Sequence, residues 1–82
     1  MNNDDDYEIK VSSLSKTYTA EGQSVEVEIY KGEDDEGWIL EVLDDFGNST
    51  VANNQFETEQ QAWDQFVTDV KNEGISAFIV GK

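Results

Sequence analysis

The sequence contains no cysteine, no histidine and no arginine. Without cysteine no disulfide constrains the unfolded chain, and without cysteine and histidine the usual soft metal ligands are missing. A chain of 82 residues is long enough for one hydrophobic core and too short for a second. We therefore predict one domain at residues 7–82, stabilised by packing alone, after a disordered acidic N-terminus at residues 1–6.

The missing side chains also limit catalysis, because histidine is the usual base and cysteine a common nucleophile. A serine with a lysine base is the remaining pair, and Ser13, Ser15 and Lys16 are close in sequence. They lie in a polar segment where nothing would activate the lysine. Two carboxylates could hydrolyse a glycoside only in a deep cleft, and the isolated glycines match no phosphate-binding loop. We predict that the protein is not an enzyme and has no catalytic residue and no cofactor.

The charge is strongly one-sided, with nineteen acidic residues, five lysines and a formal net charge of -14. Direct binding to nucleic acid or to an anionic membrane needs clustered cations, and these lysines are scattered along the chain. The charge instead favours a basic protein as the partner, with binding that weakens as salt is added. No apolar run is long enough to span a bilayer, and the N-terminus MNNDDDYEI is acidic, so we expect a cytoplasmic protein.

Alternating apolar residues predict strands from Tyr7 to Val11, from Val25 to Tyr30 and from Trp38 to Leu43. The polar residues 15–24 between the first two strands predict a loop. A turn at residues 44–48 then predicts a second hairpin and a short strand near residues 49–53, with Val51 pointing inward beside Val42.

The stretch KGEDDEGW, residues 31–38, connects two of these strands. If the apolar residues on both sides are to share one face, the connecting loop must have an even length. Pairing Lys31 with Glu36 leaves four residues, and pairing Lys31 with Trp38 leaves six; we expect four, the commoner length.

The helix signal covers residues 58–73, where Thr58 and Gln61 have the spacing of a capping box and Gly74 suits the helix end. The apolar run from Ile75 to Val80 predicts a final strand. The fold class is therefore α+β: an antiparallel sheet of about five strands, in the order β-β-β-β-α-β, with one helix packed on one face. The predicted core comprises Ile9, Val11, Val25, Val27, Ile29, Trp38, Leu40, Val42, Val51, Phe56, Ala62, Phe66, Val67, Val70 and Ile75, with members of the last strand.

Four consecutive acids at residues 33–36 suggest a calcium loop, which the EF-hand pattern can test. With Gly37 at the sixth position, Gly32 and Leu43 fall at the first and twelfth positions, which require oxygen ligands. Asp44 and Asp45 would lie at the other end of the strand that starts at Trp38. We predict no specific metal site.

The other sheet face offers a better candidate for a functional site. There carboxylates alternate with apolar and aromatic residues, and Glu26 or Glu28 should lie opposite Glu41, a destabilising pair of like charges. The alternatives are that the apolar residues are merely exposed or covered by the N-terminal segment, and that the acids serve only solubility. The predicted partner-binding residues are Glu26, Glu28, Tyr30, Ile39, Glu41 and Leu43.

We consider three functions for this acidic protein. The first is a protein-interaction module that binds a basic partner. The second is a nucleic-acid mimic that occupies the basic groove of a DNA-binding protein, and the third is weak association with calcium. Self-repulsion favours a monomer, although the edge near residues 49–53 could pair with a second copy.

The segments WILEVLDDFGNST and FETEQQAWDQFVTDVKNEGISAFIVGK contain a strand, a hairpin turn, a capped helix and a glycine that ends the helix. In these features the C-terminal half resembles small acidic bacterial proteins grouped only as a domain of unknown function. The resemblance implies the same α+β architecture and supplies no catalytic residues.

Overall fold

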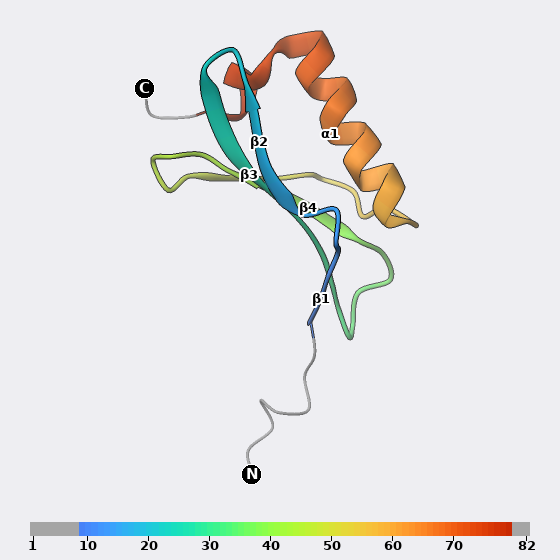
Figure 1. The fold of residues 1–82 in the computed structure, drawn as a ribbon. Coiled ribbons are helices and arrows are strands. Elements are labelled where there is room, and N and C mark those ends of the chain that lie inside the picture. The colour runs from blue at the N-terminus through green and yellow to red at the C-terminus, as the bar shows by residue number, and fades with distance from the viewer. Residues whose placement is uncertain (1–8, 80–82) are drawn as a thin grey trace.

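The computed structural model describes residues 9–79, so the predictions for residues 1–6, Tyr7 and Val80 lie outside the described residues. It contains one antiparallel sheet and one α-helix, which confirms the α+β class (Figure 1). In chain order the elements are β1 (Ile9–Val11), β2 (Lys16–Ala20), β3 (Gln23–Gly32), β4 (Ile39–Leu43), β5 (Ser49–Val51), α1 (Glu59–Glu73) and a 3₁₀ helix, η2 (Ile75–Phe78).

The long strand β3 organises the sheet. It pairs with β4 on one side, and β4 pairs with β5. On its other side β1 pairs with the C-terminal part of β3 and β2 with the N-terminal part. Between β1 and β2, the Ser12 N–H donates to the Ile29 carbonyl at 2.8 Å, and the Ser15 hydroxyl accepts from the Ile29 N–H at 2.9 Å. These two serines keep the chain attached to β3 where the regular pairing is interrupted.

Strand β2 lies where the sequence predicted a loop, so that prediction is wrong. Its polar residues face solvent at a sheet edge, and Tyr18 supplies its main apolar contact, with its ring 5.0 Å from that of Phe66. A two-residue turn joins β2 to β3, with positive φ at both Glu21 (54°) and Gly22 (78°). Such a turn has the backbone twist that hairpins prefer, and Gly22 adopts it without strain.

Helix α1 has the predicted start and end. The Thr58 hydroxyl accepts a hydrogen bond from the Gln61 N–H at 3.1 Å, and Gly74, at a φ of 86°, donates its N–H to the Val70 carbonyl. The predicted strand after Gly74 is wrong, because residues 75–78 form η2. The three-residue spacing of Ile75 and Phe78 buries both side chains in a 3₁₀ turn, where a strand would point them to opposite faces.

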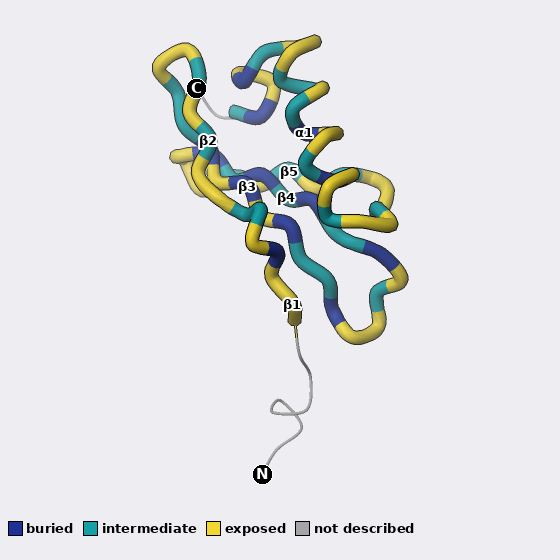
Figure 2. Tube along the Cα trace, turned by 45° about the vertical axis from the view of Figure 1, so that its right-hand side comes forward, coloured by how far each residue is buried: buried dark blue, intermediate teal, exposed yellow. Residues whose placement is uncertain are grey.

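The core lies between α1 and one face of the β3–β4 hairpin (Figure 2). Most predicted members belong to it, but Ile9, Val11 and Val51 do not, since more than half of each side chain is exposed. Phe78 belongs to it as well. The buried apolar residues of the core are Val25, Val27, Ile29, Leu40, Val42, Ala62, Phe66, Ile75 and Phe78.

The loop between β3 and β4 confirms the parity prediction but not the length. Ile29 lies opposite Leu40 and Tyr30 opposite Ile39. Continuing this register by one residue places Lys31 opposite Trp38, which is the longer of the two even loops. Backbone hydrogen bonds between Trp38 and Phe56, at 2.7 and 2.9 Å, hold the end of this loop.

The hairpin between β4 and β5 has an odd loop, which explains the error at Val51. Leu43 lies opposite Ser49, so Thr50 shares the inner face with Val42 and Val51 faces outward. The Asp44 carboxylate fixes this turn by accepting from the N–H groups of Phe46 and Asn48, both at 2.9 Å. An odd loop reverses the face of every following side chain.

Candidate functional site on the uncovered sheet face

The structure brings the six predicted partner-binding residues together on the sheet face that α1 does not cover. Along β3, buried valines and isoleucine alternate with Glu26, Glu28 and Tyr30. The register places Leu43 opposite Glu26, Glu41 opposite Glu28 and Ile39 opposite Tyr30. We call this surface the outer face; with the residues added below, it consists of Ile9, Val11, Glu26, Glu28, Tyr30, Ile39, Glu41, Leu43 and Val51.

The outer face also contains Ile9, Val11 and Val51, so the prediction that these three residues belong to the core is wrong. Val11 lies opposite Tyr30, and Val51 lies opposite Glu41. Ile9, Val11 and Val51 are 55%, 65% and 51% exposed. A residue paired with an outward-facing position of β3 or β4 must itself face outward. The positions of Ile9, Val11 and Val51 could therefore be predicted only if the pairing partners of β1 and β5 were known.

Glu28 and Glu41 form the predicted pair of like charges, and Tyr30 lies beside them. The Tyr30 hydroxyl donates to Oε1 of Glu41 at 2.9 Å. Burial raises the pKa of Tyr30 above its usual 10.0, and the hydrogen bond to Glu41 and the negative charges of Glu41, Glu28 and Asp35 raise it further. Tyr30 therefore stays protonated and donates to Glu41 throughout the neutral range.

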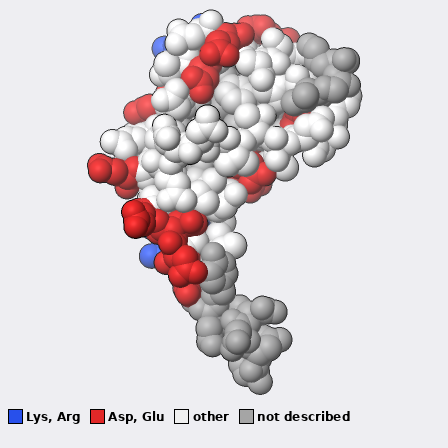
Figure 3. Space-filling model, turned by 180° about the vertical axis from the view of Figure 1, so that it is seen from behind, with Lys and Arg blue, Asp and Glu red and all other residues white. Residues whose placement is uncertain are grey.

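The lysines of the sheet lie on its other face. Lys31 follows Tyr30 on β3 and therefore points to the opposite face, where its Nζ lies 6.0 Å from the centre of the Trp38 ring. Lys10 is its cross-strand partner. Lys16 lies over the Trp63 ring at 4.7 Å. Between residues 9 and 79, the outer face thus has three glutamates and no lysine. Seen from behind, acidic groups are widespread on the molecular surface, whereas lysine covers only small areas (Figure 3).

The outer face is hollowed at one place. A shallow hollow of about 310 Å³ is lined by Ile9, Val11, Glu28, Tyr30 and Glu41. Its walls are therefore aliphatic on the β1 side and carboxylate on the β3–β4 side. No hydrogen bond or ion pair involves the Glu28 carboxylate within the described part of the chain.

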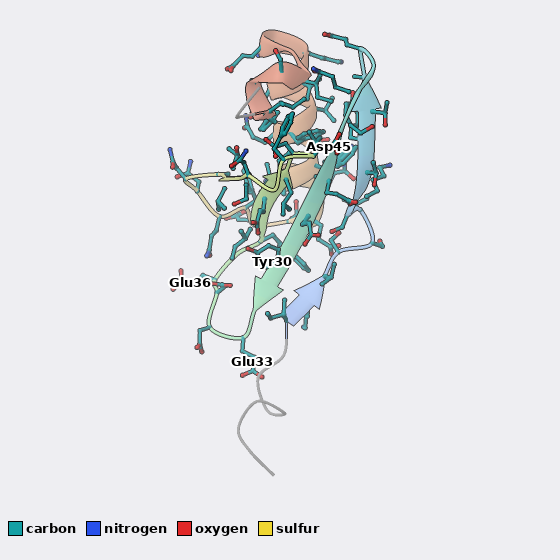
Figure 4. All side chains as sticks on the ribbon, turned by 90° about the vertical axis from the view of Figure 1, so that its left-hand side faces the viewer. Tyr30, Glu33, Glu36 and Asp45 are labelled. Atoms are coloured by element: carbon teal, nitrogen blue, oxygen red, sulfur yellow. The ribbon has the colours of Figure 1, made fainter. Side chains whose placement is uncertain are left out.

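The acidic loop at residues 33–36, where the sequence suggests a calcium loop, has a structural role. The Asp35 carboxylate accepts from the Gly32 N–H at 2.9 Å and from the Gln55 side-chain amide at 3.1 Å. Glu33 and Glu36 project from the loop, whereas Asp45 lies toward the other end of the sheet (Figure 4). Among residues 9–79, no group of three or more acidic side chains could hold a metal ion.

The serines and lysine considered for catalysis also have structural contacts. The Ser15 hydroxyl bonds both backbone groups of Ile29, and Lys16 lies against Trp63. Ser12, which was not singled out, is buried and donates from its hydroxyl to Oε1 of Glu59 at 2.5 Å, which links the first strand to the start of α1.

No family model matches the sequence, and comparisons with curated proteins and with solved structures give no match. The resemblance to small acidic bacterial proteins therefore stays a prediction. Within the described range, no helix has both the length and the apolar character needed to cross a membrane.

Proposed function

We propose that the protein is a non-enzymatic interaction module that binds a basic protein through its outer face. The observation that carries this proposal is the separation of charge across the sheet. Glu26, Glu28 and Glu41 lie on the face without α1, and the described lysines of the strands lie on the other face.

The apolar residues of the outer face support a protein partner over a small ion. Ile9, Val11 and Val51 expose more than half of their side chains, and Tyr30 is among the carboxylates. Protein interfaces commonly combine an apolar and aromatic centre with a polar rim. A partner with basic residues around an apolar centre would complement both features.

The placement of Glu28 opposite Glu41 also supports a binding role for this face, because this pair does not contribute to the stability of the sheet. Two like charges in directly opposed positions destabilise a sheet. A bound cation would remove that repulsion, so the pair is less unfavourable in the complex than in the free protein.

The test is capture of lysate proteins on the immobilised full chain, compared with a variant carrying Glu41→Lys and Tyr30→Ala. The matched control is Glu73→Lys, which makes the same charge change at an exposed residue of α1. The proposal predicts that the outer-face variant loses the captured protein while the control keeps it. Equal capture by both variants would exclude the outer face.

The same experiment separates the mimic of nucleic acid from a general interaction module. A mimic would capture only DNA-binding proteins, and competing DNA would release them. A captured protein that DNA does not release excludes the mimic. An interface with an apolar centre also retains part of its affinity at moderate salt.

A further inference from the structure

The hollow between β1 and the β3–β4 pair has the chemistry of a site for one long cationic side chain. Ile9 and Val11 form an aliphatic wall, and the carboxylates of Glu28 and Glu41 lie across from it. Its volume of about 310 Å³ is at the lower end of the range for sites that bind small ligands. It can accept a single side chain, while a helix or a strand would have to lie above it.

We propose that this hollow binds an arginine side chain of the basic partner, with the aliphatic stem against Ile9 and Val11 and the guanidinium between Glu28 and Glu41. The inference rests on the proposed function and names the residue of the partner that the outer face recognises.

The arrangement of acceptors favours arginine over lysine. Glu28 and Glu41 are directly opposed on neighbouring strands, so their Cβ atoms are about 5 Å apart. The Tyr30 hydroxyl donates one hydrogen bond to Oε1 of Glu41, so the two carboxylates keep most of their acceptor sites for a ligand. A planar guanidinium has five N–H donors in a fixed fork and can bond both carboxylates at once, whereas an ammonium acts as a point charge.

The described part of the chain places no cation at the hollow. The sequence contains no arginine, and among residues 9–79 Lys10, Lys16 and Lys31 lie on the other side of the sheet and Lys71 lies on α1. Charge complementarity at the hollow therefore favours a cation from a partner. The Tyr30 ring, which also lines the hollow, adds a surface on which a guanidinium can stack.

The test is a titration of the full chain with N-acetyl-arginine amide at low salt, followed by backbone amide chemical shifts. The proposal predicts saturable shifts centred on Glu28, Tyr30 and Glu41, with weaker binding of N-acetyl-lysine amide. Glu28→Gln should weaken arginine binding about fivefold, as expected for the loss of one partly exposed charge-assisted contact. Glu36→Gln is the matched control, because it removes the same charge at an exposed residue outside both the outer face and the hollow.

A second variant tests the aliphatic wall. Val11→Ser shortens and polarises a side chain that is already 65% exposed, so the fold should persist while arginine binding weakens. Absence of saturable shifts, equal binding of the lysine probe, or an equal effect of Glu28→Gln and Glu36→Gln would overturn the arginine site.

Capture of the partner distinguishes this inference from the proposed function. If Glu41→Lys with Tyr30→Ala abolishes capture and Glu28→Gln leaves it unchanged, the arginine site is wrong and the outer face still binds the partner. If none of these changes affects capture, the proposed function is wrong.

Discussion

Glu28 and Glu41 lie directly opposite each other on β3 and β4, on the sheet face that α1 leaves uncovered. Each inner-face pair beside them, such as Val27 with Val42, is apolar and buried. The two faces of the β3–β4 hairpin thus differ in composition. The inner side is packed for stability, and the outer side retains a repulsive pair.

Removing one charge of this pair should stabilise the free protein. We expect Glu28→Gln to raise the free energy of unfolding by about 0.5 kcal/mol, because the repulsion with Glu41 is lost. Glu36→Gln is the control for the general reduction of negative charge, since Glu36 is exposed in the loop between β3 and β4. Urea unfolding at low salt measures both. A Glu28→Gln variant no more stable than Glu36→Gln would show that the pair has no energetic effect.

The raised pKa of Tyr30 predicts a loss of stability at alkaline pH. Because the pKa is above 10.0 in the folded protein, the unfolded chain ionises first. The contribution of Tyr30 is therefore complete below about pH 10 and is lost as the pH rises through the folded pKa. The difference in unfolding free energy between the parent and Tyr30→Phe, measured by urea unfolding across this range, isolates the effect.

Glu41→Gln provides the control for the cause of the shift. It removes a carboxylate that both accepts from the Tyr30 hydroxyl and repels the tyrosinate, so the pKa of Tyr30 should move down toward 10.0. Spectrophotometric titration of tyrosinate, taken as the difference from Tyr30→Phe, reads this pKa directly. A folded pKa at or below 10.0 in the parent would refute the assignment.

The turn between β4 and β5 depends on the Asp44 carboxylate. Asp44 is only 7% exposed and accepts from the N–H groups of Phe46 and Asn48. We expect Asp44→Ala to lower the free energy of unfolding by about 2 kcal/mol, because these turn donors lose their acceptor. Asp45→Ala, at the exposed neighbouring position, should change it by less than about 0.5 kcal/mol. Similar effects of the two substitutions in urea unfolding would contradict this role.

Gly37 should tolerate no side chain. A Cβ at this position would lie 2.7 Å from the Phe56 carbonyl oxygen, beside the hydrogen bonds that join Trp38 to Phe56. We expect Gly37→Ala to destabilise the protein by about 2 kcal/mol through this overlap. Glu36→Ala changes an exposed neighbour and should be close to neutral. Equal unfolding midpoints for the two variants would mean that the loop shifts to accommodate the methyl group.

Much of the architecture could be predicted because several local signals agree. The alternation of Val25, Val27 and Ile29 predicts β3, and the Thr58 cap with Gly74 predicts both ends of α1. Strand β2 was missed because an edge strand needs little apolar alternation, and Tyr18 alone provides its packing. The apolar run after Gly74 was assigned to a strand because periodicity over four to six residues does not separate a strand from a 3₁₀ turn.

The outer face was predictable only in its central part. The six residues on β3 and β4 follow from parity within one hairpin, and the structure places them together. Ile9, Val11 and Val51 depend on loop lengths and pairing partners that the sequence does not reveal, and an error of one residue moves a side chain to the opposite face. The hollow is lined by residues of β1 as well as of β3 and β4, so it could not be inferred from the sequence.

The central claim is that the outer face binds a basic partner. The most direct measurement is the set of backbone amide shifts of the labelled full chain on addition of a basic protein captured by the parent and not by the outer-face variant. The account predicts that the largest shifts cluster at residues 26–30 and 39–43, and that Glu73→Lys leaves them in place. Shifts confined to α1 or to the acidic loop at residues 33–36 would contradict it.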